Sequence, residues 1–213
     1  MRNLIKKIVN FMCFIPRKIY YSRKKKRLKN QNFTIISRDC FGTFVYHNLG
    51  LQYKTPTVNL FFSKEDFITF VFNLKEFLNV ELEEVFGHNK PFPVGKLFYD
   101  NKTVTVYFMH YSTFEEAKSK WDERKRRIDF SNIYIVSVIN NGLTEEYVKK
   151  FEALPFENKL IISNKNEFNS KVIVTHKIFD KKNYCGEFLK FKPPFFCKRY
   201  MDDIDYISFL NSK

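Results

Sequence analysis

Short apolar runs typical of buried strands alternate along this chain with segments whose apolar residues recur at helical spacing. This alternation predicts an α/β fold with a mostly parallel, Rossmann-like sheet flanked by helices. The predicted strands are 33–36, 55–62, 96–99, 104–109, 132–139, 159–163 and 171–175, with a short strand or loop at 81–86. The predicted helices are one that ends at Gly50, followed by 63–78, 112–128, 144–153 and 204–210.

Local signals set the expected boundaries of several elements. Gly50 directly follows the last apolar residue of its helix, and Gly takes the left-handed conformation at a helix end cheaply. Capping-box patterns at Ser63-Lys-Glu-Asp66 and Ser112-Thr-Phe-Glu115 predict the starts of two further helices. A polar turn separates the strands 96–99 and 104–109, so these two strands are expected to form a β-hairpin.

The length and composition favour an ordered globular protein. The chain has 213 residues, is rich in Phe and Tyr, and contains only 6 Gly and 7 Pro. We expect a basic, amphipathic N-terminal arm at 1–31 and a single α/β domain at 32–213. Two small α/β lobes, at about 32–110 and 111–213, are the alternative division of that domain.

Basic charge is concentrated at the N-terminus. The formal net charge is +14, but residues 1–31 contain eleven Lys and Arg and no Asp or Glu, so the remaining chain is close to neutral. An apolar-faced helix followed by a polybasic run suits the surface of an anionic membrane, which we expect to be a partner. A solvated tail that docks on its own domain is the alternative. Nucleic acid is not an expected partner, because the body carries no further basic signal.

The N-terminal apolar run is too short and too charged to span a bilayer, and it lacks a signal-peptide cleavage site. The expected location is therefore cytoplasmic, peripheral on the inner face of the cell membrane. Cys13, Cys40, Cys185 and Cys197 form no CxxC pair, so reduced thiols are expected and a zinc site is not. No other metal signature is present, and no cofactor is predicted.

The polar turn between the first strand and the first helix, residues 37–42, is the leading candidate site. In α/β folds ligands bind beyond the carboxyl ends of the strands, where helix N-termini offer free N–H groups. Cys40 at such an N-terminus could be a nucleophile, although a buried free Cys is often only structural. Ser37 and Asp39 could bind substrate or cap the helix. Gly42 permits close approach of a ligand or of the helix to the sheet.

Five residues elsewhere are further candidates. His110 follows a predicted strand and could act as an acid or base beside Cys40. Asn59 is polar within an apolar run, so it is either a structural tie or a ligand contact. Arg124 and Arg127, with Trp121 one turn earlier, could hold a phosphate or carboxylate, or could form a solvated basic face.

Several motifs resemble an uncharacterised bacterial family known as exopolysaccharide biosynthesis proteins, which carries a domain of unknown function. These motifs are Ser37-Arg-Asp-Cys-Phe-Gly42, Thr55-Pro-Thr-Val-Asn-Leu-Phe61, Phe92-Pro-Val-Gly95, His110-Tyr111 and Leu154-Pro-Phe156. The similarity covers most of residues 33–163. The chain departs from the family at Arg38 and Asp39, where Asn-type residues are frequent.

The resemblance implies a pathway, the biosynthesis of capsule or exopolysaccharide. Within it we expect a transferase that adds a glycosyl, acyl or phosphoryl-linked group to a lipid-linked or nucleotide-linked saccharide. The expected substrate is a saccharide or sugar phosphate, and glycosyltransferases of the same pathway are expected partners. The alternative is a non-catalytic saccharide-binding or scaffold subunit of a membrane-associated glycosyltransferase complex.

Overall fold

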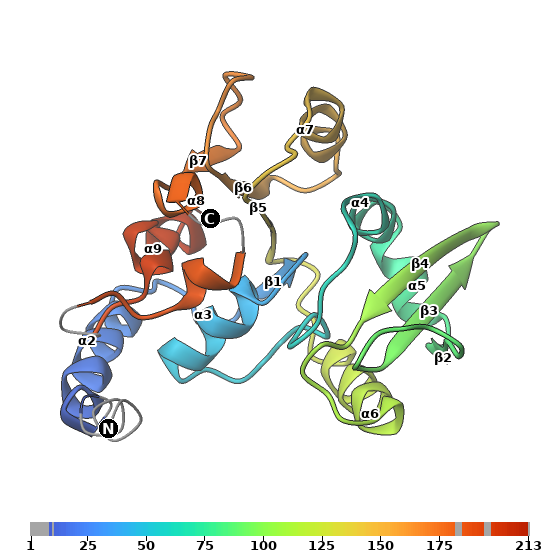
Figure 1. Ribbon diagram of the computed structural model, residues 1–213, viewed down its shortest axis with the longest axis horizontal. Coiled ribbons are helices and arrows are strands. Elements are labelled where there is room, and N and C mark those ends of the chain that lie inside the picture. The colour runs from blue at the N-terminus through green and yellow to red at the C-terminus, as the bar shows by residue number, and fades with distance from the viewer. Residues whose placement is uncertain (1–8, 10, 182–184, 194–196, 213) are drawn as a thin grey trace.

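The computed structural model describes residues 9, 11–181, 185–193 and 197–212. Two sheets organise the molecule, a parallel one of four strands and an antiparallel one of three (Figure 1). The first part of the predicted N-terminal arm, residues 1–8 and 10, lies outside the described residues. The prediction of an α/β fold with a mostly parallel sheet is confirmed.

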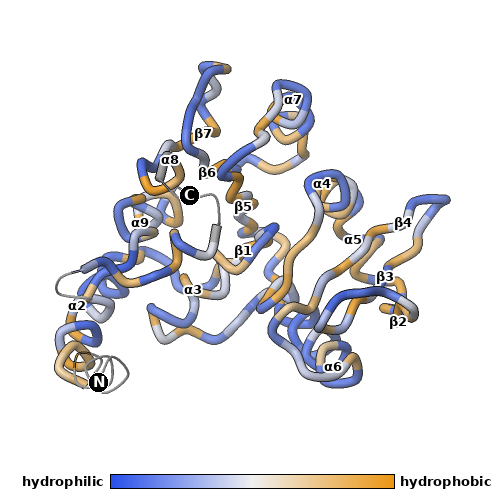
Figure 2. Tube along the Cα trace, in the orientation of Figure 1, coloured by the Kyte–Doolittle hydropathy of each residue, from blue (hydrophilic) through white to orange (hydrophobic). Residues whose placement is uncertain are grey.

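The parallel sheet has the strand order β1-β5-β6-β7. Its strands are β1 (Thr34–Ser37), β5 (Ile133–Ile139), β6 (Asn158–Ser163) and β7 (Ile173–Thr175). Every neighbouring pair is parallel, and Ile36 of β1, for example, pairs with Ile135 of β5. All seven residues of β5 are buried, as expected for a central strand covered on both faces. Hydrophobic residues accordingly concentrate along β5 and β6 (Figure 2).

Side chains alternate between the two faces of this sheet and enter two separate hydrophobic cores. Tyr134 and Val136 point to the core that contains α3 (Phe41–Leu49) and the C-terminal segments α8 (Ile178–Lys181) and α9 (Tyr206–Leu210). Ile133 and Ile135 point to the opposite core. That second core also contains residues of α4 (Lys64–Phe72), α7 (Glu145–Glu152) and the antiparallel sheet.

The antiparallel sheet contains β2 (Glu83–Glu84), β3 (Val94–Tyr99) and β4 (Lys102–Tyr107). The predicted hairpin is confirmed as β3 and β4. Asp100 and Asn101 form its turn with φ of 46° and 58°. Positive φ at both central residues is typical of the type I′ hairpin turn, whose twist matches that of the two strands. The sheet packs with α5 (Leu74–Asn79) and α6 (Phe114–Lys125).

Residues 55–62, predicted as a buried strand, instead form a loop that crosses between the two sheets. Only Phe61 makes a bridge, to Tyr107 of β4. Asn59 has a φ of 61°, a left-handed conformation that interrupts any strand and that Asn tolerates better than most residues. The apolar run reflects burial rather than sheet pairing, because Val58, Leu60 and Phe62 are fully buried.

Two helix boundaries also differ from the prediction. The helix expected at 63–78 is divided at Asn73, whose φ of −119° and ψ of 43° end α4 and begin α5. Ser63 caps α4 as predicted, accepting a hydrogen bond from the Asp66 amide. The cap of α6 is Thr113, which accepts from the Glu116 amide, one residue beyond the predicted box.

The N-terminal helix α2 (Phe14–Lys26) packs against the C-terminal segment, which includes the 3₁₀ turns η1 (Cys185–Leu189) and η2 (Tyr200–Asp203). These segments, at opposite ends of the sequence, lie side by side (Figure 1). Tyr21 and Lys24 both donate to the Asp202 carboxylate, at 2.7 and 2.9 Å. Pro16 lies in the first turn of α2, where no intrahelical N–H donor is needed, so it does not end the helix. None of the helices that the structure describes has the length and apolarity to cross a membrane.

Candidate functional site

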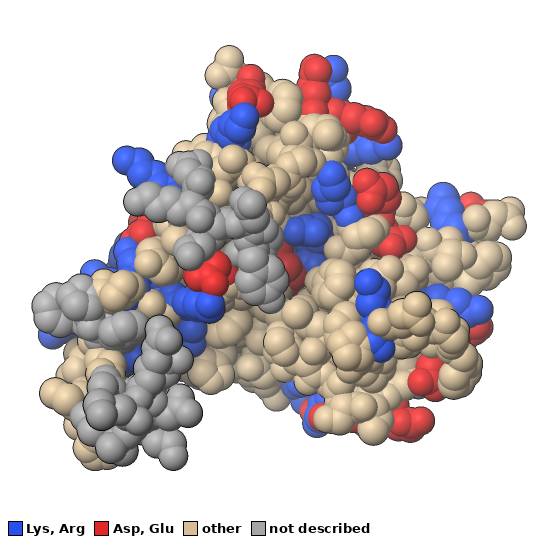
Figure 3. Space-filling model, viewed as in Figure 1, with Lys and Arg blue, Asp and Glu red and all other residues tan. Residues whose placement is uncertain are grey.

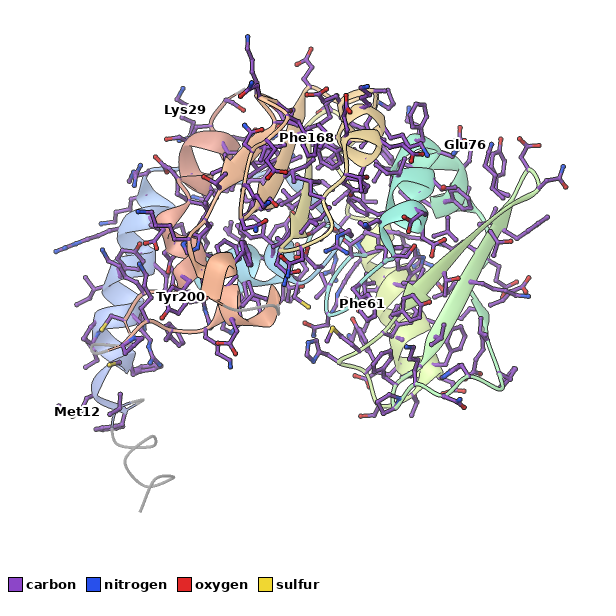
Figure 4. The ribbon with its side chains drawn as sticks, turned by 45° about the horizontal axis from the view of Figure 1, so that its top comes forward. Met12, Lys29, Phe61, Glu76, Phe168 and Tyr200 are labelled. Atoms are coloured by element: carbon purple, nitrogen blue, oxygen red, sulfur yellow. The ribbon has the colours of Figure 1, made fainter. Side chains whose placement is uncertain are left out.

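A cavity of about 730 Å³ lies beyond the carboxyl ends of β1 and β5. It is bounded by the turn after β1, the loop after β4 and the C-terminal segment. Its lining residues are Arg38, Asp39, Cys40, Phe44, Phe61, Met109, His110, Val138, Asn140, Gly186, Phe188, Leu189, Lys190, Phe191 and Arg199. Phe61 lies between the parallel-sheet part and the antiparallel-sheet part of the molecule (Figure 4). Three of the predicted site residues, Asp39, Cys40 and His110, therefore meet in one cavity.

Asp39 joins helix α3 to strand β5 at the floor of this cavity. One carboxylate oxygen accepts from the Phe41 amide and the other from the Val138 amide, both at 2.9 Å. Burial raises the pKa of this carboxyl group, against the opposing effects of Arg38 and the two amides. Both oxygens are already engaged with the backbone, so the contacts of Asp39 correspond to the predicted capping alternative.

Arg38 is anchored just beneath the cavity surface. Its guanidinium donates to the Ser137 hydroxyl at 3.1 Å, to the Phe62 carbonyl at 3.4 Å and to the Val138 carbonyl. These bonds spread its donors over β5 and the crossing loop. Arg38 thus ties together three segments that meet at the cavity and contributes positive charge to its floor.

Cys40 is buried immediately before α3, and its Sγ lies 3.9 Å from the Leu60 carbonyl oxygen. Burial, reinforced by the neighbouring Asp39 carboxyl group, raises the pKa of this thiol to about 12. The helix N-terminus was expected to favour the thiolate, but removal from water outweighs the dipole here. The thiol at this position is protonated at neutral pH.

His110 lies in the loop after β4 and has an exposed side chain. Its imidazole makes no hydrogen bond within the part of the chain that the structure describes. Both ring nitrogens are therefore available to a ligand in the cavity. Because a neutral imidazole has one donor and one acceptor, His110 can give or take a proton there.

Arg199 and its aromatic neighbours form the wall contributed by the C-terminal segment. The guanidinium carbon lies 4.0 Å from the centre of the Phe191 ring and 4.5 Å from that of Phe44. The same side chain donates to the Leu189 carbonyl and, at 3.4 Å, to Asn48. No local pattern marked Arg199, because its partners on α3 lie some 150 residues earlier in the chain.

Ser37 and Gly42 lie behind the cavity wall rather than in it. Ser37 is fully buried, its amide donates to Thr57 Oγ1 at 3.1 Å, and its hydroxyl has no partner among the described residues. A Cβ on Gly42 would lie 3.1 Å from Ile35 Cγ2 and 3.3 Å from Ser37 Cβ. Gly42 therefore allows α3 to pack closely against β1, the second of its two expected roles.

The remaining predicted residues are not brought to the cavity. Trp121 is buried in the core against Phe70 and Phe108. Arg124 donates to the Tyr111 hydroxyl at 2.6 Å, and Arg127 donates to the Tyr53 carbonyl and pairs with Glu123. The backbone N–H of Asn59 donates to Thr43 Oγ1 at 3.0 Å, which ties the crossing loop to α3 without using the Asn59 side chain. Arg124 and Arg127 are thus half-buried and held by Tyr111 and Tyr53, rather than forming a solvated basic face.

Among the residues that the structure describes, no three His, Cys, Asp or Glu side chains are grouped closely enough to hold a metal ion. The cavity combines aromatic rings with Arg38, Lys190 and Arg199, and its one carboxyl group is bound to backbone amides. Such a lining suits a ligand that has both a ring system and negative charge.

The sequence matches known proteins over nearly its whole length. Residues 12–211 match the family model of the domain of unknown function DUF1919. The chain is also 34% identical over 187 residues to an uncharacterised protein of Haemophilus influenzae, and this alignment covers 88% of each chain. The family match includes every element that lines the cavity. The protein therefore belongs to the DUF1919 family.

Proposed function

We propose that this protein is a transferase of surface-polysaccharide biosynthesis whose substrate is a saccharide on a phosphate-bearing carrier, either a nucleotide or a lipid. The cavity beyond β1 and β5 is the main support for the proposal, because aromatic rings and cations meet there around one accessible imidazole. The assignment to polysaccharide biosynthesis rests on the motif resemblance at residues 37–42, 55–61 and 92–95.

The cavity lining matches the two parts of such a substrate. Sugar rings and nucleobases pack their faces on aromatic side chains. Phe44 and Phe61 are the lining rings for this role, because the guanidinium groups of Arg17 and Arg199 lie over Phe191. A phosphate group needs cationic partners, and Lys190 and Arg199 bring positive charge to the wall formed by the C-terminal segment. Lys190 also pairs with Glu187, and Arg199 also donates to Leu189 and Asn48. Arg38 adds positive charge at the floor, while its own donors are used by the protein.

The chemistry assigned to this site is direct transfer to an acceptor hydroxyl. For a glycosyl group, His110 removes the proton of the acceptor hydroxyl as its oxygen bonds to the sugar carbon. The bond from that carbon to the carrier phosphate oxygen breaks, and the phosphate leaves with the electron pair. Lys190 and Arg199 stabilise the negative charge of the departing phosphate. The attacking group in this scheme is the acceptor oxygen, so the Cys40 thiol, whose pKa burial raises to about 12, is not assigned a step.

A second candidate is a non-catalytic saccharide-binding subunit that acts with glycosyltransferases of the same pathway. It is favoured by the hydrogen bonding of Asp39 and by the protonation of Cys40. Asp39 uses both carboxylate oxygens on backbone amides, and Cys40 is buried and protonated. Only His110 then remains for proton transfer among the described lining residues, and a binding protein needs no such group.

Substitution of His110 separates the two candidates. Surface polysaccharide is purified from strains that carry the wild-type gene, a deletion or His110→Ala, and its sugars and substituents are compared by NMR. For a transferase we expect the same sugar or substituent to disappear in the deletion and in His110→Ala. His47→Ala is the matched control, because His47 is exposed on α3 and does not line the cavity.

The other outcomes are equally decisive. If the deletion lowers the amount of polymer, its composition stays constant and His110→Ala behaves as wild type, the binding subunit is supported. If the deletion changes neither the amount nor the composition of the surface polysaccharide, both candidates are wrong. Western blotting of each variant establishes that the altered proteins accumulate to wild-type levels.

A further inference from the structure

Helix α2, together with the residues that flank it at 11–13 and 27–28, has two faces with different surroundings. One face carries residues at helical spacing that are buried or pack against the C-terminal segment. These residues are Cys13, Arg17, Tyr21, Lys24 and Leu28. The opposite face carries Phe11, Ile15 and Ile19. These residues are spaced four apart, so their side chains lie in one row along the helix. Phe11 is 84% exposed and Ile15 is 65% exposed. Such a row of large apolar residues is unusual on a water-facing helix.

The apolar row lies on a projecting part of the molecule. Met12, which is 69% exposed beside the row, lies at the end of α2 that extends away from the body (Figure 4). The same end of the helix is coloured hydrophobic in Figure 2. Phe14, at 63% exposure, widens the row on one side. A flat partner could therefore reach all of these side chains together.

Basic residues accompany the row along the helix. Lys18, Arg23 and Lys26 are exposed and make no ion pair within the part of the chain that the structure describes. No acidic residue is present anywhere in residues 1–31. The face visible in Figure 3, by contrast, mixes acidic and basic side chains over the upper and right-hand parts of the body. Lys24 on the inner face of α2 pairs with Asp202, so positive charge without an ionic partner among the described residues is a property of the outer face.

We propose that the outer face of α2 docks on the surface of a bilayer that contains anionic lipids. The apolar row would enter the boundary between headgroups and acyl chains, while Lys18, Arg23 and Lys26 would face the phosphate groups. A helix with this division of charge and apolar residues lies in the plane of the interface. The projecting position and the absence of acidic residues favour a lipid surface over a shaped protein partner.

The helix proposed to dock also adjoins the wall of the cavity. The guanidinium carbon of Arg17, on α2, lies 3.7 Å from the centre of the Phe191 ring, and that of Arg199 lies 4.0 Å from it. Phe191 and Arg199 line the cavity. Arg17 of α2 is therefore in direct contact with a residue of the cavity wall. The inference stands on α2 alone and does not depend on the proposed transferase activity.

Vesicle binding of the full chain tests the proposal. Purified protein is sedimented with vesicles of phosphatidylcholine alone or of phosphatidylcholine mixed with phosphatidylglycerol. We expect binding to the mixed vesicles that weakens as sodium chloride is raised, and little binding to phosphatidylcholine alone. Replacing Lys18, Arg23 and Lys26 by Ala should lower the affinity for mixed vesicles on the order of 100-fold.

The apolar row has its own variant and control. Phe11→Ser/Ile15→Ser/Ile19→Ser should lower binding to mixed vesicles by more than about tenfold, because the apolar contribution to docking is lost. Phe86→Ser/Phe98→Ser removes two exposed aromatic side chains, 80% and 56% exposed, far from α2 in the sequence, and should bind as wild type. Urea unfolding of each variant establishes that the fold is retained.

Two outcomes would overturn the proposal. One is that the wild-type chain does not sediment with the mixed vesicles at low salt, or that the serine variant sediments equally well. The other is that light scattering finds a dimer of the wild-type chain and a monomer of the serine variant, with no vesicle binding. A second copy of the chain, rather than a lipid surface, would then cover the row. Neither outcome would change the polysaccharide test of His110.

Discussion

At the scale of single residues, the turn after β1 shows how position decides the chemistry of a side chain. Asp39 and Cys40 are adjacent in the sequence, yet Asp39 binds two backbone amides and Cys40 lies against a carbonyl oxygen. Desolvation dominates the pKa of both groups and favours their neutral forms. A helix N-terminus activates a thiol only where solvent or a cation helps to stabilise the thiolate.

We expect Cys40 to resist alkylation in the folded protein. A pKa of about 12 in place of 9.0 lowers the thiolate fraction at pH 8 by about 1,000-fold, and only the thiolate reacts. Iodoacetamide labelling at pH 8, followed by mass spectrometry of the Cys40 peptide, measures this directly. The same peptide in urea-unfolded protein is the control. Labelling of the folded protein at the unfolded rate would restore Cys40 as a candidate nucleophile.

At the scale of elements, α3 is positioned at three points along its length. The Asp39 carboxylate accepts a hydrogen bond from the first residue of the helix, and Gly42 allows close contact with β1. Gly50 ends the helix with a φ of 59°, and its amide donates to carbonyls of the last turn. Since Phe44 on α3 lines the cavity, the placement of this helix also sets one wall of the site.

Gly50 provides a test of the helix end. Gly50→Ala should lower the free energy of unfolding by about 1 kcal/mol, because a Cβ disfavours the left-handed conformation. Among the described residues, no atom apart from those of Gly50 and its two chain neighbours lies within 4 Å of the position that this Cβ would occupy, so the loss measures backbone strain rather than a clash. Gly50→Asn should lose less, since Asn tolerates this conformation. Urea denaturation that finds equal losses for both variants would contradict this explanation.

At the scale of the whole molecule, the C-terminal segment joins the N-terminal helix to the cavity. Asp202 is the centre of this junction, with no exposed side-chain surface. Its carboxylate accepts from Tyr21 and Lys24 of α2, from the Tyr206 hydroxyl at 3.2 Å and from the Arg199 amide at 2.7 Å. One buried carboxylate therefore holds α2, α9 and the segment that carries the Arg199 guanidinium.

The two partners of the buried ion pair should differ in their importance. Asp202→Asn leaves the Lys24 cation buried without its counter-charge, and we expect it to lower the free energy of unfolding by about 3 kcal/mol. Burial already lowers the pKa of Lys24, which is consistent with a costly location for that charge. Lys24→Met should lose less, about 1 kcal/mol, since Asp202 keeps three other donors.

Urea unfolding measures both variants, and limited proteolysis reports whether α2 detaches first. If Lys24→Met is the more destabilising substitution, the carboxylate is not the centre of the junction. Arg27→Ala is the control, because its pair with Asp205 at 3.5 Å is exposed on both sides and should contribute little.

Local patterns in the sequence were sufficient to predict the α/β class, most strands and several helix ends of this protein. These features depend on interactions between residues that are close in the sequence, so local patterns encode them. They are the strand and helix periodicities, the Ser63 cap, the helix end at Gly50 and the β3–β4 hairpin. The polar turn after the first predicted strand marked Cys40, and the end of the predicted strand 104–109 marked His110. Both residues line one cavity.

Tertiary structure alone decided the rest, because it depends on contacts between residues distant in the chain. The loop at 55–62 has the apolar pattern of a strand, but the left-handed Asn59 and burial between two sheets make it a crossing segment. Arg199 enters the cavity only because the C-terminal segment returns to α3. Burial of the Cys40 thiol arises in the same way, since its carbonyl neighbour Leu60 comes from the crossing loop and removes the thiol from water.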